Sequence, residues 1–239
     1  MTLFRNGINY GGIYMLQKLI DSDLYKIGTP LKLHLGCGQQ YLRGYINIDF
    51  PPEQHNVMSV SADAYADITK LSFPENSVDE IRLHHVFEHF DRVTALILLV
   101  RWQYWLKIDG ILHIETPDVL ESAKQLASDI SYEQKMLIIR HLEGDQSAPW
   151  GFHVGQWWNE RYENTLSKLG YYITDVKQSQ WDRWPHLANI TVLVTKLISL
   201  SKAQQIESCK VLLKDSMVAA GESKTYNVWV EKLLDGLRE

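Results

Sequence analysis

The chain has 239 residues, enough for one large domain or one domain with an appendage and for a sizeable core without disulfides. Its formal net charge is −5 and its Lys and Arg residues are scattered, so no basic surface for a phosphate backbone is expected and nucleic acid is a poor substrate. Cys37 and Cys209 lack metal-type spacing, which predicts free thiols in a reducing compartment. No segment has the pattern of a signal peptide or a membrane span, and a cytoplasmic location is predicted.

The first predicted element is an N-terminal helical segment over residues 1–30. From Leu31 onward, short apolar runs alternate with longer stretches of helical spacing, which is typical of βαβ units and a mainly parallel sheet. Val93–Lys107 is apolar nearly all round, as expected for a helix pressed against a sheet. Strands are predicted at Leu31–Leu35, Tyr45–Asp49, Asp79–Leu83 and Ile111–Glu115.

Residues 118–160 are predicted to form an insertion that covers the site. Within it, Ser131 and Gln134 match a capping box for a helix that ends near Gly144, and Ala148–Trp158 is a Gly- and aromatic-rich loop. A further helix ends near Gly170, a typical C-terminal stop.

The last part of the predicted sheet is an antiparallel edge hairpin, formed by Tyr171–Val176 and Ile190–Thr195. Ser201–Glu239 reads as two helices broken at Gly221. The predicted fold class is therefore α/β: a Rossmann-like, mainly parallel sheet with an antiparallel edge hairpin, helices on both faces and extra C-terminal helices. The main domain spans 31–200, and 201–239 is a helical appendage.

The strongest local signal is a short apolar strand that runs straight into a glycine turn, Leu33-His34-Leu35-Gly36-Cys37-Gly38. Glycines there let the backbone approach a ligand closely. Asp49 ends the next predicted strand, and a carboxylate at that place can accept hydrogen bonds from both hydroxyls of a ribose. A turn of this kind followed by a strand-end acid indicates a nucleotide site.

With these motifs the sequence resembles the class I S-adenosylmethionine-dependent methyltransferases, in particular the small LGCG type associated with small-molecule and polysaccharide modification. The resemblance covers Leu31 to Asp118 and includes Asp67–Asp79 and the turn Leu106–Leu112. It implies a Rossmann-like fold, S-adenosylmethionine as cofactor and S-adenosylhomocysteine as product. In such enzymes the glycine turn cradles the methionine part, the acid after the second strand holds the ribose, and Asp67 and Ile68 contact the adenine. The implied cofactor-binding residues are Gly36, Cys37, Gly38, Asp49, Phe50, Asp67, Ile68 and His84.

Three departures from the family pattern stand out. His34 occupies a place where many relatives have a carboxylate, so a contact to the methionine amino group is lost or replaced. Only residues 38–44 separate the first two strands, too few for a full crossover helix. Ile108-Asp109 replaces a Pro-Gly pair. A nicotinamide-dependent Rossmann enzyme is disfavoured, because Tyr41 stands where the third glycine of that motif belongs.

The segment His84–His89 follows the fourth predicted strand, at the edge where open α/β sheets bind ligands. Its His85-x-x-Glu88-His89 spacing matches an inverted zinc-protease motif, which the methyltransferase-like frame disfavours. It is also similar to an E-x-x-E-H element of certain metal-assisted O-methyltransferases, so a divalent metal stays open, although none is predicted. Imidazole suits a general base for a hydroxyl acceptor. The predicted catalytic residues are His89, His153, His85 and Glu88.

Gly151–Trp158 is expected to close over the acceptor, and its aromatic rings can bind the C–H faces of a sugar or simply pack in the core. Trp181, Trp184 and His186 carry the same ambiguity and favour packing. The first hypothesis is O-methylation of a saccharide or another small polyhydroxy metabolite. The alternatives are an N- or C-methyltransferase, and a non-catalytic partner of glycan-assembling enzymes. A homodimer stays open.

Overall fold

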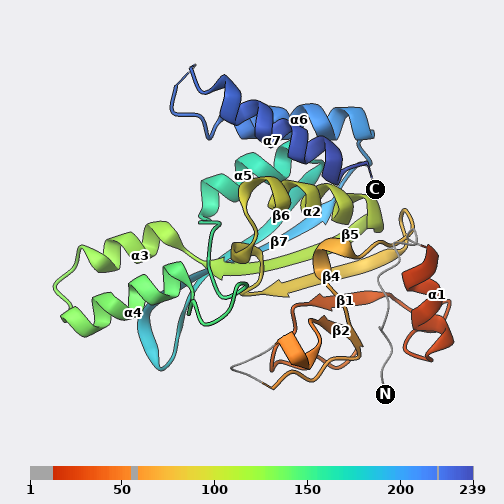
Figure 1. The fold of residues 1–239 in the computed structure, drawn as a ribbon. Coiled ribbons are helices and arrows are strands. Elements are labelled where there is room, and N and C mark those ends of the chain that lie inside the picture. Colours follow the sequence, from red (N-terminus) through yellow and green to blue (C-terminus); the bar gives the residue numbers. More distant parts are fainter. Residues whose placement is uncertain (1–12, 55–58, 220, 239) are drawn as a thin grey trace.

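The computed structural model describes residues 13–54, 59–219 and 221–238, and it contains a seven-stranded sheet in the order β3-β2-β1-β4-β5-β7-β6 (Figure 1). Strands β1 to β5 are parallel, and β7 runs antiparallel to both β5 and β6. The predicted fold class, a mainly parallel Rossmann-like sheet with an antiparallel edge hairpin, is confirmed. The strands are β1 (Lys32–Leu35), β2 (Ile46–Asp49), β3 (Ala64–Tyr65), β4 (Val78–His84), β5 (Leu106–Pro117), β6 (Tyr171–Trp181) and β7 (Trp184–Lys196).

Most of the helices gather on one side of the sheet, where α2 contacts β5, α5 contacts β6, and α6 and α7 pack on α2 (Figure 1). The two C-terminal helices thus form an outer layer over α2. The helices are α1 (Ile13–Asp21), α2 (Arg92–Trp105), α3 (Val119–Leu126), α4 (Tyr132–Glu143), α5 (Asn159–Lys168), α6 (Lys202–Lys214) and α7 (Ser223–Gly236). The predicted N-terminal segment 1–30 lies within the described residues only from residue 13 onward.

Helix α2 is buried nearly all round, as its sequence predicts, because the sheet lies on one side and α6 and α7 on the other. The carboxylate of Asp91 accepts hydrogen bonds from the amides of Val93 and Thr94 and begins the helix. The same carboxylate forms an ion pair with Lys232 of α7 at 2.7 Å. One cap residue therefore both starts α2 and ties the C-terminal layer to it.

The connection from β1 to β2 contains no helix, as its length predicts. The two strands still pair in parallel, with Leu33 opposite Ile46 and Leu35 opposite Ile48. Asn47 stabilises the short loop, because its side chain bonds both the amide and the carbonyl of Leu42. The glycine turn at the end of β1 is therefore held by loop contacts to β2 rather than by a crossover helix.

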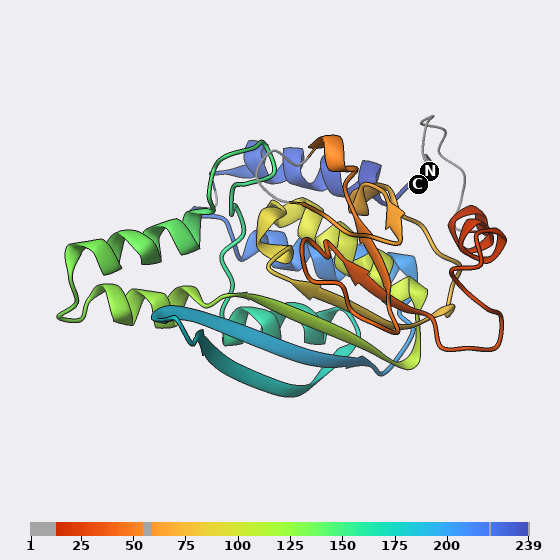
Figure 2. The ribbon, with the colours of Figure 1, turned by 90° about the horizontal axis from the view of Figure 1, so that it is seen from below.

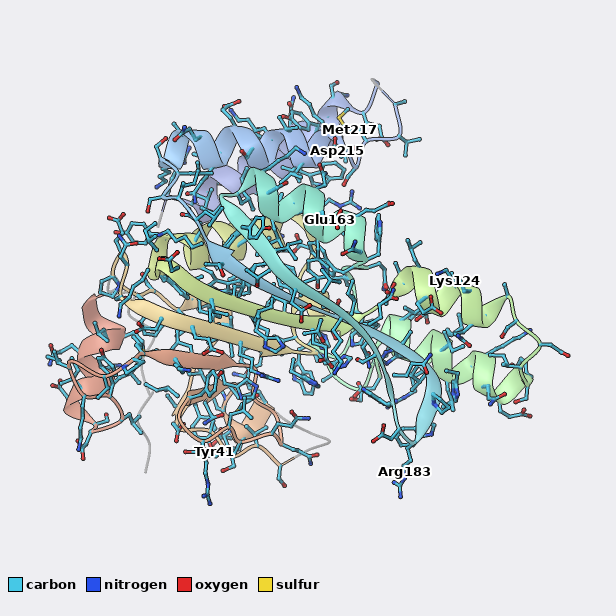
Figure 3. All side chains as sticks on the ribbon, turned by 180° about the vertical axis from the view of Figure 1, so that it is seen from behind. Tyr41, Lys124, Glu163, Arg183, Asp215 and Met217 are labelled. Atoms are coloured by element: carbon cyan, nitrogen blue, oxygen red, sulfur yellow. The ribbon has the colours of Figure 1, made fainter. Side chains whose placement is uncertain are left out.

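The edge hairpin is longer than its apolar runs predict, with β6 and β7 continuing to Trp181 and from Trp184. Arg183 marks its turn in Figure 3. Helices α3 and α4 project from the body of the domain as an arm beside this hairpin (Figure 2), and both contact β7. The predicted capping box of Ser131 and Gln134 is confirmed at the start of α4.

Both cysteine thiols are free and buried, in agreement with the sequence analysis. Among the described residues no helix combines the length and the hydropathy that a bilayer-spanning segment needs.

The central strands alternate apolar residues on the helix-covered face with polar residues on the other face, where Arg82 of β4 lies beside His113 of β5. Burial and the positive charge of Arg82 lower the pKa of His113 to about 4. This strand position therefore holds a neutral imidazole in the folded chain.

The folded chain should lose stability as the pH falls from 6.5 to 4, because the unfolded His113 takes up a proton in that window and the folded one does not. His113 is expected to lower the free energy of unfolding by up to about 1.4 kcal/mol for each pH unit of this fall. Chemical denaturation of wild type and His113→Gln across this pH range measures it as the difference in slope. Parallel curves for the two proteins would show that His113 is not responsible.

Candidate active site

A cavity of about 400 Å³ lies at the carboxyl ends of β1, β2 and β4. This is the edge where open α/β sheets bind ligands. Every residue predicted for cofactor binding lines it, namely Gly36, Cys37, Gly38, Asp49, Phe50, Asp67, Ile68 and His84. His34, Gln39, Gln40, His85, Val86, His89, Phe90 and Trp150 complete the lining.

The glycine turn after β1 has left-handed backbone at both glycines, with φ of 68° at Gly36 and 54° at Gly38. The amide of Gly36 donates to the carbonyl of Ile48 at 2.8 Å, which fixes the turn to β2. A Cβ atom added to Gly36 would lie 2.4 Å from Cγ2 of Val86. Glycine is required at position 36 for both its conformation and its space.

Gly36→Ala is expected to abolish binding of the cofactor that the sequence resemblance implies, because the added methyl group displaces Val86 and the left-handed backbone disfavours alanine. Gly28→Ala is the matched control, since Gly28 also has a positive φ but nothing within 4 Å of the added Cβ. Calorimetric titration with S-adenosylmethionine measures the effect. Equal affinity for wild type and Gly36→Ala would contradict the role given to this turn.

Asp49 is a buried carboxylate at the end of β2, and it lies directly behind the glycine turn. One of its oxygens accepts a hydrogen bond from the amide of Gly38 at 2.6 Å, and the other accepts from the amide of Phe50 at 2.7 Å. Asp49 therefore fixes the turn and lines the cavity beside it.

Asp67 begins the short 3-10 helix Ile68–Lys70. Its Oδ1 atom accepts from the amide and the hydroxyl of Thr69, while Oδ2 lies 3.3 Å from Nζ of Lys70. Oδ2 is thus paired with Lys70, and buried Ile68 follows the carboxylate. Asp67 and Ile68 both line the cavity.

His34, which replaces a carboxylate of the family pattern, is 1% exposed and bonds Asn47 Oδ1 through Nδ1 at 3.0 Å. Burial lowers the pKa of His34. The residue therefore presents a neutral imidazole to the cavity and cannot supply the negative charge of a carboxylate.

His85 follows β4 directly and has φ of 53°, a conformation that is strained for a side chain of this size. Its Nδ1 atom lies 3.1 Å from Oε1 of Glu88, and its Nε2 atom lies 3.6 Å from Oε1 of Glu115. Burial opposes a charge on His85, but the two carboxylates outweigh it and raise the pKa of His85 to about 9. His85 is therefore an imidazolium between two carboxylates at neutral pH, which disfavours it as a general base.

Glu88 and His89 lie in the short 3-10 helix Phe87–His89, and the loop 151–158 is clamped to this helix. The amides of Val154 and Gly155 both donate to the carbonyl of Glu88, at 2.9 and 2.8 Å. This places His153 against His89, with ring centroids 4.6 Å apart. His89 lines the cavity, and Glu88 and His153 are not among its lining residues.

The aromatic residues of the loop Ala148–Trp158 are of two kinds, buried in the core or accessible to solvent. Trp157 is buried and stacks on Tyr162, and Cζ of Arg161 lies 4.0 Å from the centroid of its ring. Trp157 therefore belongs to the core. Trp150 lines the cavity and donates from Nε1 to the carbonyl of Gln54. Phe152 is 44% exposed.

Three residues near the histidines were not predicted as site residues. Glu115 of β5 accepts a hydrogen bond from Thr191 and lies 2.8 Å from Nε2 of His84. The ring of Trp181 contacts the rings of both His85 and His141. No local sequence signal marks Glu115 or His141, because strand pairing and the α3–α4 arm bring them to the site.

Searches for related proteins found no matching family model and no matching curated protein. Among solved structures, the chain is similar to an S-adenosylmethionine-dependent methyltransferase of Methanosarcina mazei, with 13% identity, 74% of this chain and 97% of that chain covered, and a TM-score of 0.45. A second one, from Mesorhizobium loti, has 16% identity, coverage of 75% and 96%, and a TM-score of 0.47. At these identities the likeness concerns the fold alone.

Proposed function

We propose that this chain is an S-adenosylmethionine-dependent methyltransferase that methylates a hydroxyl group of a saccharide or another small polyhydroxy metabolite. The observation that carries the proposal is the lining of one cavity. Gly36 and Gly38 lie at it with the two strand-end acids Asp49 and Asp67, and His89 lines the same cavity. The proposed nucleoside-binding residues and the proposed catalytic histidine thus line the same cavity.

The residues around the cavity divide the work of binding and alignment. Asp49 accepts the ribose hydroxyls, Asp67 and the backbone of Ile68 hold the adenine, and the glycine turn receives the methionine part. When bound, S-adenosylmethionine supplies an electrophilic methyl group on a sulfonium. Methyl transfer is an in-line displacement, so the protein contributes mainly orientation and the exclusion of water.

A hydroxyl acceptor must also lose its proton as its oxygen bonds to the methyl group. His89 is the candidate to act on that hydroxyl, because it lines the cavity, where His84 and His85 are paired with carboxylates. Its Nδ1 atom lies 3.1 Å from the carbonyl oxygen of Phe152, so Nδ1 carries the proton and Nε2 keeps a free lone pair. His153 supports His89 through the contact between their rings, and Glu88 lies in the same cluster.

A saccharide acceptor is proposed from one aromatic residue at the cavity and one exposed in the same loop. Trp150 lines it and Phe152 is exposed next to His153. Flat rings bind the C–H faces of sugars, while imidazoles and carboxylates serve the hydroxyls. An N- or C-methyltransferase would have less need of this histidine cluster.

Labelled S-adenosylmethionine, incubated with the protein and fractionated cell extract, tests the proposal. Mass spectrometry should find a labelled product heavier by one methylene, and its fragments should place the methyl group on an oxygen. Label on nitrogen or carbon would replace the O-methyl assignment. Cofactor binding without any labelled product from any fraction would instead support a non-catalytic partner protein.

A further inference from the structure

Glu88 is a carboxylate that the fold buries without satisfying it. The residue is 1% exposed, and only Oε1 has a hydrogen-bond partner, His85. The Oε2 atom is buried and has no partner among the described residues. An unpaired buried oxygen of this kind costs free energy, so it calls for a cationic or proton-donating ligand.

The imidazoles of His89 and His153 lie in one cluster with this carboxylate. His89 Nδ1 lies 3.1 Å from the carbonyl oxygen of Phe152, and His153 Nδ1 lies 2.9 Å from that of His141. A carbonyl oxygen can only accept, so in both rings Nδ1 is the donor. The Nε2 atoms of both rings are therefore free to bind a ligand. Metal-binding histidines are commonly oriented in this way, with one ring nitrogen donating to a backbone carbonyl.

The three ligand atoms of Glu88, His89 and His153 lie within 4.8 Å of one another. His153 Nε2 is 3.9 Å from Oε1 of Glu88, and the neutral form of that ring has no proton there to share. The three groups are thus close enough to one another to share one ion. Two imidazoles with one carboxylate suit a divalent first-row transition-metal ion, whereas Mg²⁺ and Ca²⁺ prefer oxygen ligands.

We propose that Glu88, His89 and His153 bind a divalent first-row transition-metal ion at the acceptor end of the cavity. His89 lines the cavity, so positions left open on the ion would face the acceptor. There the ion lowers the pKa of a bound hydroxyl, so that the proton leaves to solvent as the oxygen takes the methyl group. This role of the ion rests on the proposed function, while the binding of the ion does not.

The test is titration of the full, metal-stripped chain with Co²⁺, followed by d–d absorption and calorimetry, with Mg²⁺ as the control ion. Wild type should bind one equivalent of Co²⁺ with a spectrum typical of nitrogen and oxygen ligands. Glu88→Gln and His153→Ala should each weaken Co²⁺ binding at least about tenfold. Thermal unfolding and S-adenosylmethionine titration of both variants show that they are folded.

Glu115→Gln is the discriminating variant, because His84, His85 and Glu115 form a second group with compatible spacing. It should keep Co²⁺ affinity. Loss of binding in Glu115→Gln with retention in Glu88→Gln would overturn the assignment, and so would absence of Co²⁺ binding to a wild-type chain that binds S-adenosylmethionine. If His153→Ala folds and Glu88→Gln does not, the Co²⁺ affinity of His153→Ala alone tests the site, and an affinity equal to that of wild type would overturn the assignment.

Discussion

Asp49→Ala is expected to weaken S-adenosylmethionine binding roughly 100-fold or more. The variant removes the proposed acceptor for both ribose hydroxyls, and hydrogen bonds to a charged group contribute about 1.5–3 kcal/mol each. It also frees the amide of Gly38 and so loosens the glycine turn. Calorimetric titration with S-adenosylmethionine gives the affinity directly, and Asp49→Asn should show an intermediate loss.

Asp79→Asn is a suitable control for Asp49, because Asp79 lies toward the opposite end of the sheet, where it pairs with Lys107 and with the amide of Leu31. It removes the same charge far from the cavity lining. Binding that is unchanged in Asp79→Asn and in Asp49→Ala alike would show that the ribose is held elsewhere.

His89→Ala and His153→Ala should each lower kcat for a hydroxyl acceptor by about 10²- to 10⁴-fold, the range typical of proton-transfer catalysis. The reason is that His89 would take the proton of the acceptor through Nε2 with His153 in support, or that both Nε2 atoms would bind a metal ion. Affinity for S-adenosylmethionine should persist in His153→Ala, because His153 lies outside the cavity lining.

The rate of methyl transfer at saturating acceptor measures this effect. His113→Gln is the control, because it removes an imidazole from β5 that does not line the cavity. The role of the cluster is refuted if both alanine variants turn over at the wild-type rate. The Co²⁺ titration then separates a metal ion from a general base as the reason for any loss.

The cofactor side of the site could be predicted because its residues stand in short local motifs. The glycine turn, Asp49 and Asp67 each follow a strand or begin a turn, and parallel strands bring such ends to one edge. The structure places all of them around one cavity, although their roles stay a prediction.

The acceptor side could be predicted only where it is local in sequence, as in His84–His89. Glu115, His141 and Trp181 come from β5, α4 and the edge hairpin, and only tertiary packing brings them together. The far end of β6 was missed because Gln178, Ser179 and Gln180 break the apolar alternation. Strand β3 has two residues, too few to leave a periodic signal.

The central claim is that the cavity behind Gly36 and Asp49 receives S-adenosylmethionine. Calorimetric titration of the wild-type chain with S-adenosylmethionine, and separately with NAD, tests it most directly. One equivalent of S-adenosylmethionine should bind, S-adenosylhomocysteine should compete for the same site, and NAD should give no heat of binding. A chain that is folded but binds NAD, or neither compound, would contradict the account.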